Sequence, residues 1–451
     1  MSSATASLPF PTSYSLPGPY AVARLPLLEH VCPRLSPACV GKQCAVTLEF
    51  LVPRLLPEGG GDEGEGEGEE GGAAGAGNGG AGRGRQGRAA SSKTAHVAPP
   101  RRAPLAILSG GFLVGRGAYA STARHLCSWG FAVASYDKAE TVLSPLDDVV
   151  SAAVVLEVAD FVGSSAGLSE LIDPGRLYLV GHSRGGKLSV LAAARDGAES
   201  GGASAGGSGE GGGGASAGGS GEGGGGAPPP PAPSVPPPPP PPSPPRPPRV
   251  RALGLVDPVN NTVYAPQGPR FPSATAALRG VPALASTPLL AVASGALVSG
   301  RDCAPAAAAA PSFFEACRSA PAWLVTLQPA GHFQFLDEQT AVQRMVCASG
   351  PVEDGAVRAS ARAALAAWGR LTIFGDGGGG GGGEEERRNG GRGVSSPSPP
   401  SSSPDELLER TERDIEELLS DGMTKGGGGG EYTKKLRAPP FLSSQRKHIS
   451  F

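Results

Sequence analysis

The stretch that decides the fold is residues 176–195, which read RLYLVGHSRGGKLSVLAAAR. Its first five residues form a short apolar run that is typical of a buried strand. Residues 187–195 carry apolar and alanine residues at helical spacing, and the intervening GHSRGG contains three glycines. The pattern therefore predicts a strand, a sharp turn and a helix, the repeating unit of a parallel α/β fold.

The turn contains the pattern Gly-x-Ser-x-Gly at 181–185. Between a strand and a helix, this pattern lifts the serine Oγ clear of the backbone and lets neighbouring chains pack against the two glycines. A bare match arises by chance in a chain rich in glycine and serine, and an ordinary strand–helix turn is the simpler alternative. The flanking elements favour a nucleophile at Ser183, with the backbone N–H of Arg184 facing a developing oxyanion.

A serine nucleophile requires a histidine base. The histidines are His30, His96, His125, His182, His332 and His448. Where this motif lies on such a sheet, the chain order is nucleophile, acid, base, which leaves His332 and His448. His448 lies in a polar tail, whereas His332 follows an apolar run at 322–327. We therefore expect His332 to be the base, and we expect His182 to pack under the turn.

Three acidic residues between Ser183 and His332 are candidates for the carboxylate that orients the base. Asp196 ends the helix after the turn and is expected to point away. Asp257 directly follows a predicted strand, at the edge where α/β sheets place their sites. Asp302 follows the next strand after a longer loop. Strand position alone leaves Asp257 and Asp302 both open.

A second oxyanion donor is expected in the loop after the strand at 105–108. Gly110 and Gly111 give this loop a flexible backbone, so a backbone N–H near Phe112 can turn toward the nucleophile. A simple glycine turn is the alternative.

The same alternation of strands and helices extends in both directions. Further strands are expected at 19–28, 44–55, 105–108, 131–136, 251–256, 288–294 and 322–327, and helices at 118–129, 145–162 and 357–374. Together they predict a single α/β domain over 12–374, with a mostly parallel central sheet flanked by helices.

Long insertions interrupt this domain. Glycine (71) and proline (47) make up about a quarter of the 451 residues and gather in a few stretches. Residues 58–94 and 199–249 are predicted to be disordered, because they hold too little apolar surface to offset the entropy of ordering. The second insertion contains an identical twelve-residue repeat at 203–214 and 215–226, followed by a polyproline stretch.

The tail at 375–451 is predicted to be largely disordered, apart from a helix near 404–421. Pro404 and two acidic residues suit the first turn of this helix, and Leu408, Ile415 and Leu419 form one apolar edge. Two interpretations stay open, a docking helix for a protein partner and a solvated helix of marginal stability.

Composition excludes several classes. The net charge of −2 argues against a nucleic-acid binder, which needs a basic surface. No C-x-x-C pair is present, so we expect no metal site of that kind. The first 25 residues lack the apolar core of a secretory signal and are compatible with a short organelle transit peptide.

With these residues identified, the chain resembles the chlorophyllases, which belong to the α/β-hydrolase superfamily and occur in plants and algae. The resemblance covers roughly 100–198 and 250–345. It rests on Gly-His-Ser-Arg-Gly-Gly-Lys at 181–187, Gly-Phe-Leu at 111–113, Trp-Gly-Phe at 129–131, Asp-Pro-Val at 257–259, Cys-Ala-Pro at 303–305, Phe-Phe-Glu-Ala-Cys at 313–317 and Gly-His at 331–332. The series in this order is far more specific than the serine motif alone.

The resemblance implies an α/β-hydrolase fold with Ser183 as nucleophile, Asp257 as acid and His332 as base, and so favours Asp257 over Asp302. It implies hydrolysis of chlorophyll to chlorophyllide and phytol in the chloroplast, with no metal or organic cofactor. An ester this apolar is compatible with peripheral membrane contact, although no amphipathic anchor stands out.

The chain departs from the family at two places. Gly110-Gly111 stands where relatives often have His-Gly, and Asn260-Asn261 stands where they have Asp-Gly. Two rival functions stay open. One is a general carboxylesterase or lipase with the same three residues. The other is a non-catalytic binding or scaffold protein that works through the proline-rich insertion and the 404–421 helix.

Overall fold

The computed structural model describes residues 13–32, 45–54, 102–141, 146–200, 247–262, 266–295, 305–317, 320–328, 330–375, 413 and 446–450. These residues form an α/β structure built on one mixed sheet of ten strands. The strands are β1 (Ala21–Arg24), β2 (Leu28–Val31), β3 (Ala45–Arg54), β4 (Ala103–Ser109), β5 (Ala132–Lys138), β6 (Ile172–His182), β7 (Val250–Val256), β8 (Leu289–Ser294), β9 (Ala322–Leu327) and β10 (Arg446–Ser450).

The sheet is mostly parallel. Its order is β1-β3-β5-β4-β6-β7-β8-β9-β10, and β2 also pairs with β3. The pairs from β5 through β10 are parallel, whereas β1, β2 and β5 each run antiparallel to β3. The parallel strands therefore end at one edge, where such sheets place their sites.

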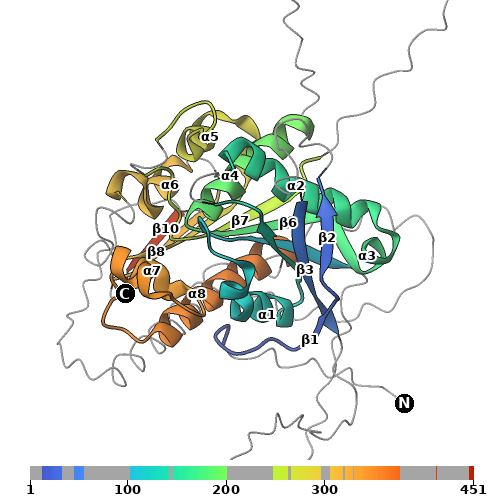
Figure 1. Cartoon of the computed structure of the whole chain (residues 1–451), viewed down its shortest axis with the longest axis horizontal. Helices are drawn as coiled ribbons and strands as arrows, with labels where there is room; N and C mark the ends of the chain where they lie inside the picture. Colours follow the sequence, from blue (N-terminus) through green and yellow to red (C-terminus); the bar gives the residue numbers. More distant parts are fainter. Residues whose placement is uncertain are drawn as a thin grey trace, which may run out of the picture.

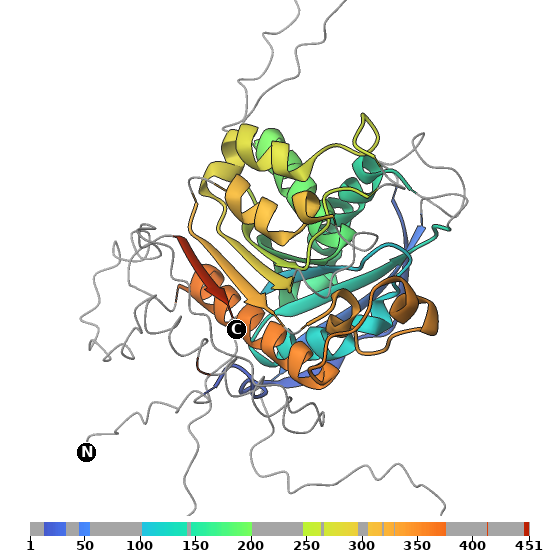
Figure 2. The same cartoon turned by 90° about the vertical axis from the view of Figure 1, so that its left-hand side faces the viewer.

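Helices cover both faces of the sheet (Figures 1 and 2). They are η3 (Arg116–Tyr119), α1 (Ala120–Ser128), α2 (Asp148–Ser164), α3 (Ala166–Leu171), α4 (Arg184–Ser200), α5 (Ala274–Gly280), η4 (Pro282–Ser286), η5 (Ala306–Ala308), α6 (Ala310–Ala316), η6 (His332–Phe335), α7 (Ala341–Val346), α8 (Asp354–Gly369) and the π-helical turn η7 (Arg370–Phe374). Helices α2, α4, α5 and α6 lie on one face, and α1 and α8 on the other.

The strands are buried on both faces because successive side chains point to opposite sides. Leu105 and Ile107 of β4 pack in the core under α2 and α4, whereas Ala106 and Leu108 pack toward α1 and α8. This explains why the central strands read as continuous apolar runs rather than alternating ones.

The sheet and its helices confirm the predicted α/β class with a mostly parallel sheet, and the architecture is compatible with an α/β-hydrolase-like fold. The predicted strand at 19–28 divides into β1 and the start of β2, with Pro26 between them. The helix after Ser183 continues to Ser200, two residues into the predicted second insertion.

In the tail, residues 446–450 form β10 beside β9, a strand that the sequence does not predict. The predicted helix at 404–421 lies outside the described residues except for Arg413, and the insertions at 58–94 and, beyond Ser200, up to Arg246 lie outside them as well. Among the helices of the described part, none has the length and apolar character that crossing a membrane requires.

Candidate active site

Ser183 lies in a tight turn between β6 and α4. Its φ is +56°, a left-handed conformation that is uncommon for a residue with a side chain. The backbone N–H of Ser183 donates to the carbonyl of Val256 at 3.0 Å, and its own carbonyl accepts from Gly186 at 3.0 Å and from Val259 at 3.1 Å. These bonds hold the strained residue at the end of the strand, as the serine motif predicts.

The two glycines of the motif are required by close packing. A Cβ on Gly181 would lie 2.2 Å from the carbonyl oxygen of Gly185, and a Cβ on Gly185 would lie 2.0 Å from that of Ser109. Both distances are far inside van der Waals contact. The structure therefore confirms that residues 181 and 185 allow neighbouring backbone segments to approach the turn.

His332 begins η6, a short helical turn that follows β9. The buried amide of Gln334 fixes this segment, because its Oε1 accepts from the N–H of Gly331 at 2.7 Å and its Nε2 donates to the carbonyl of Val352 at 2.7 Å. The imidazole of His332 is itself only 3% exposed.

Ser183, His332 and Asp257 form one hydrogen-bonded chain. Ser183 Oγ lies 3.0 Å from His332 Nε2, and His332 Nδ1 lies 2.6 Å from Asp257 Oδ2. A carboxylate can only accept, so Nδ1 carries the proton and Nε2 is free to accept from the serine hydroxyl. The three predicted residues thus meet in the geometry that general-base activation of a serine requires.

Asp257 follows β7 and is 3% exposed. Its Oδ1 accepts from the N–H of Ser294 at 3.0 Å, and its Oδ2 accepts from the Ser294 hydroxyl at 2.7 Å. Burial alone would raise the pKa of Asp257, but the bonds from His332 and Ser294 outweigh it and hold this pKa below its ordinary value. Asp257 is therefore an anion suited to orient and stabilise a charged imidazole.

The loop after β4 lies against the nucleophile. A Cβ on Gly111 would lie 3.3 Å from the Cβ of Ser183, so the backbone from Gly111 to Phe112 borders the serine. Arg184 is the first residue of α4, where backbone N–H groups have no partner within the helix. The predicted donors at Arg184 and Phe112 therefore belong to segments that flank Ser183.

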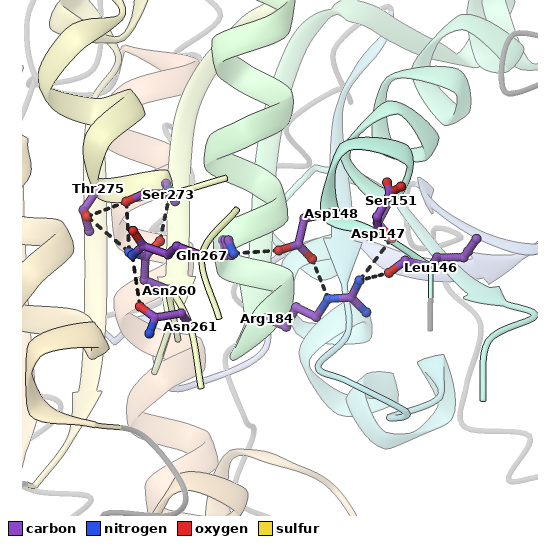
Figure 3. A network of polar contacts seen from close by, with 12 residues as sticks. Leu146, Asp147, Asp148, Ser151, Arg184, Asn260, Asn261, Gln267, Ser273 and Thr275 are labelled. Atoms are coloured by element: carbon purple, nitrogen blue, oxygen red, sulfur yellow. Dashed lines mark hydrogen bonds and ion pairs between the residues drawn. The ribbon is translucent and has the colours of Figure 1, made fainter. Parts of the chain in front are cut away.

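The Arg184 side chain lies in a buried ionic network (Figure 3). Its guanidinium contacts Asp148 at 2.7 Å, Glu140 at 2.9 Å and the carbonyl of Leu146. The Phe112 ring covers it, with the guanidinium carbon 5.6 Å from the ring centroid. The side chain of Arg184 thus holds the turn, and only its backbone is available to the site.

Of the other two acidic candidates, only Asp196 lies among the described residues, and it does not join the site. Asp196 lies within α4 and pairs with Arg249 at 2.8 Å, so it anchors the chain where β7 begins. Asp302 lies outside the described residues. The placement of Asp257 agrees with the choice that the family resemblance favours.

Asn260, one of the departures from the family pattern, is 2% exposed. Its side chain accepts from the N–H of Ala274 at 2.8 Å and donates to Ser273 at 3.1 Å and to Thr275 at 3.2 Å (Figure 3). Asn260 therefore ties the segment after Asp257 to the start of α5. This contact gives the departure a structural role.

Sequence reasoning missed the residues that support the three central ones. Ser294 has a weak signal, since it ends a predicted strand beside the one that precedes Asp257. Gln334 lies two residues after His332, but its partners Val352 and Asp354 are distant in the sequence. Such contacts become visible only when the sheet is assembled.

Comparison of the chain with models of known protein families and with curated proteins finds no match. The functional assignment therefore rests on the residues themselves and their geometry.

Proposed function

We propose that this protein is a serine carboxylic-ester hydrolase of the α/β-hydrolase fold, and that its substrate is chlorophyll. The hydrogen-bonded chain from Ser183 through His332 to Asp257 is the observation that carries the hydrolase assignment. The choice of substrate rests on the sequence resemblance to the chlorophyllases, and with it we place the reaction in the chloroplast.

In the proposed reaction, His332 Nε2 takes the proton from Ser183 as the serine Oγ attacks the ester carbonyl carbon. The carbonyl oxygen becomes an oxyanion, which accepts hydrogen bonds from the backbone N–H groups of Arg184 and Phe112. Asp257 holds Nδ1–H of His332 and stabilises the imidazolium without taking its proton.

Collapse of this intermediate breaks the bond to the alcohol oxygen, which leaves as phytol after receiving the proton from His332. The acid part stays attached to Ser183 as an acyl-enzyme. Water then attacks the acyl carbon while His332 accepts its proton, and return of that proton to Ser183 Oγ releases chlorophyllide.

The surroundings of Ser183 suit an apolar ester. Phe112 and Leu113 are 42% and 44% exposed, although both are large apolar residues. They follow Gly111, whose backbone borders the nucleophile. Exposed apolar side chains beside a reactive group favour a substrate with a large apolar surface.

The experiment compares purified wild type and Ser183→Ala on chlorophyll a and, in parallel, on p-nitrophenyl butyrate. Wild type should release chlorophyllide, and Ser183→Ala should lower kcat roughly 10⁴-fold or more on both esters. Retention of hydrolysis by Ser183→Ala would refute the mechanism.

The two substrates separate the proposals. Cleavage of the butyrate ester without release of chlorophyllide would support the hydrolase assignment but reject chlorophyll as the substrate. The protein would then be a general carboxylesterase that acts on another ester. Inactivity of wild type on both esters, with no labelling of Ser183 by a fluorophosphonate, would favour a binding protein.

A further inference from the structure

His182, the residue before the nucleophile, is buried between two parts of the site. Its imidazole is 3% exposed. Nδ1 lies 2.9 Å from the hydroxyl of Tyr119, and Nε2 lies 3.1 Å from the backbone carbonyl of His332. A carbonyl can only accept, so Nε2 carries the proton, and Nδ1 of a neutral ring accepts from Tyr119.

Tyr119 continues this chain to the loop after β4. Its hydroxyl accepts from the backbone N–H of Gly111 at 2.9 Å, which leaves its own proton for Nδ1 of His182. The order is then fixed, from Gly111 N–H to Tyr119 and His182 and finally to the carbonyl of His332. Each donor in the chain has one acceptor.

The environment keeps both side chains uncharged. Burial and, to a smaller extent, the nearby imidazole of His332 lower the pKa of His182 to about 3, and they outweigh Asp257 and the carbonyl of His332, which raise it. Burial raises the pKa of Tyr119. The direction of these hydrogen bonds therefore stays the same from about pH 5 to about pH 9.

The chain connects the three segments that the proposed reaction uses. Gly111 precedes Phe112, the proposed oxyanion donor, and His182 precedes Ser183. The ring of His182 also packs on that of His332, with centroids 4.8 Å apart. The loop needs such support, because Leu113 has a φ of +56°, a conformation that surrounding contacts must enforce.

We propose that Tyr119 and His182 are positioning residues that fix the oxyanion loop and the main chain of His332 relative to Ser183. This inference rests on the proposed ester hydrolysis. Neither side chain contacts Ser183 Oγ in the hydrogen bonds of the described structure, and no proton needs to move along the chain. Its effect is to hold the donor near Phe112 in place before charge develops.

Tyr119→Phe is the decisive variant. A cavity lined by Leu108, Tyr119 and His182 adjoins the rings, so truncation to alanine would enlarge it and disturb packing. Phenylalanine removes the hydroxyl alone. We expect kcat on p-nitrophenyl butyrate to fall about 10- to 100-fold with KM within about two-fold, and phosphonylation of Ser183 by a fluorophosphonate to slow in parallel.

Tyr178→Phe is the matched control. Tyr178 is fully buried on β6, and its hydroxyl donates to the carbonyl of Leu365 at 3.1 Å, away from the loop. It should keep kcat near the wild-type value. Wild-type kcat in Tyr119→Phe, or equal losses in both variants, would overturn the proposal.

A second measurement does not depend on turnover. Side-chain ¹⁵N NMR should show His182 as the neutral Nε2–H tautomer from pH 5 to 9, with its signals assigned by their loss in His182→Gln. In Tyr119→Phe, this tautomer preference should weaken. If wild type hydrolyses no ester, the proposed function fails, and the NMR result still decides the chain, because a His182 that titrates near its ordinary pKa would refute it.

Discussion

The backbone of Ser183 is strained. A left-handed conformation costs a residue with a side chain roughly 1–2 kcal/mol, and glycine avoids this cost. The φ of +56° places Ser183 in that region, with its N–H bonded to Val256. The surrounding backbone hydrogen bonds enforce this conformation, which places the Oγ beside His332. The same conformation therefore lowers the stability of the fold and serves the proposed activity.

We therefore expect Ser183→Gly to raise the free energy of unfolding by about 1 kcal/mol relative to Ser183→Ala, since alanine keeps the strain. Both variants lack the nucleophile and should be inactive. Urea unfolding followed by circular dichroism measures the difference. Equal stability of the two variants would show that the turn is not strained.

His125 makes the stability depend on pH. Burial and, to a smaller extent, the charge of Arg362 lower its pKa to about 4, and they outweigh the bond to the carbonyl of Tyr14, which raises it. An unfolded histidine has a pKa near 6.5. Between these values the unfolded chain binds a proton that the folded chain does not, so stability falls as the pH falls from about 6.5 to about 4.

The contribution of His125 to this slope is at most about 1.4 kcal/mol per pH unit. His125→Gln should flatten the dependence of the unfolding free energy on pH below about 6.5 by up to this amount. Above pH 7.5 the slopes of wild type and variant should agree. Parallel curves throughout would mean that His125 is protonated in the folded state.

At the scale of elements, helix α2 is joined to α4 by a buried charge. Asp148, at the start of α2, contacts Arg184 at 2.7 Å (Figure 3). It also contacts Lys187 at 2.6 Å. The side chains of Asp148 and Lys187 are each 2% exposed. Burial lowers the pKa of Lys187, and Asp148 opposes this change. The carboxylate of Asp148 thus balances the charges of two cations in the first turn of α4.

Asp148→Asn should lower the free energy of unfolding by about 3–5 kcal/mol, because it leaves the buried Lys187 without its counter-ion and Arg184 with Glu140 alone. Glu199→Gln is the control, since Glu199 pairs with Arg195 on an exposed face of α4. That change should cost about 0.5 kcal/mol or less. Chemical denaturation of both variants tests the contrast, and similar small losses would contradict it.

The elements that the sequence predicts best are those with an uninterrupted local pattern. Strand β6 and helix α4 surround the serine motif as expected, and β7 and β9 lead to Asp257 and His332. Strand β10 was missed because RKHIS has no apolar alternation, and its position depends on pairing with β9, more than a hundred residues earlier. Local pattern carries no information about such a partner.

At the scale of the whole molecule, the sheet brings distant residues together. Ser183 follows β6, Asp257 follows the adjacent β7, and His332 follows β9 at the same edge. Chain order and strand ends therefore suffice to predict Ser183 and His332, whereas the choice of Asp257 over Asp302 also needs the family resemblance. The bond between Tyr119 and His182 joins residues 63 positions apart, and no local signal links them.

The second insertion enters between elements. Helix α4 ends at Ser200 and β7 begins at Val250, so the insertion interrupts a connection and leaves the strands of the sheet intact. Deletion of 203–226, which removes both copies of the repeat, should keep ester hydrolysis within about two-fold, since loop length affects closure entropy only weakly. Loss of activity on p-nitrophenyl butyrate would show that the repeat contributes to the site.

The proposed function depends above all on Ser183 acting as the nucleophile of an ester hydrolase. The most direct test is to titrate the wild type with a fluorophosphonate, follow p-nitrophenyl butyrate hydrolysis, and locate the adduct by peptide mass spectrometry. We expect one adduct per chain, on Ser183, with activity falling in proportion to labelling. Hydrolysis that persists when Ser183 is fully labelled, or that is lost through labelling of another residue, would contradict it.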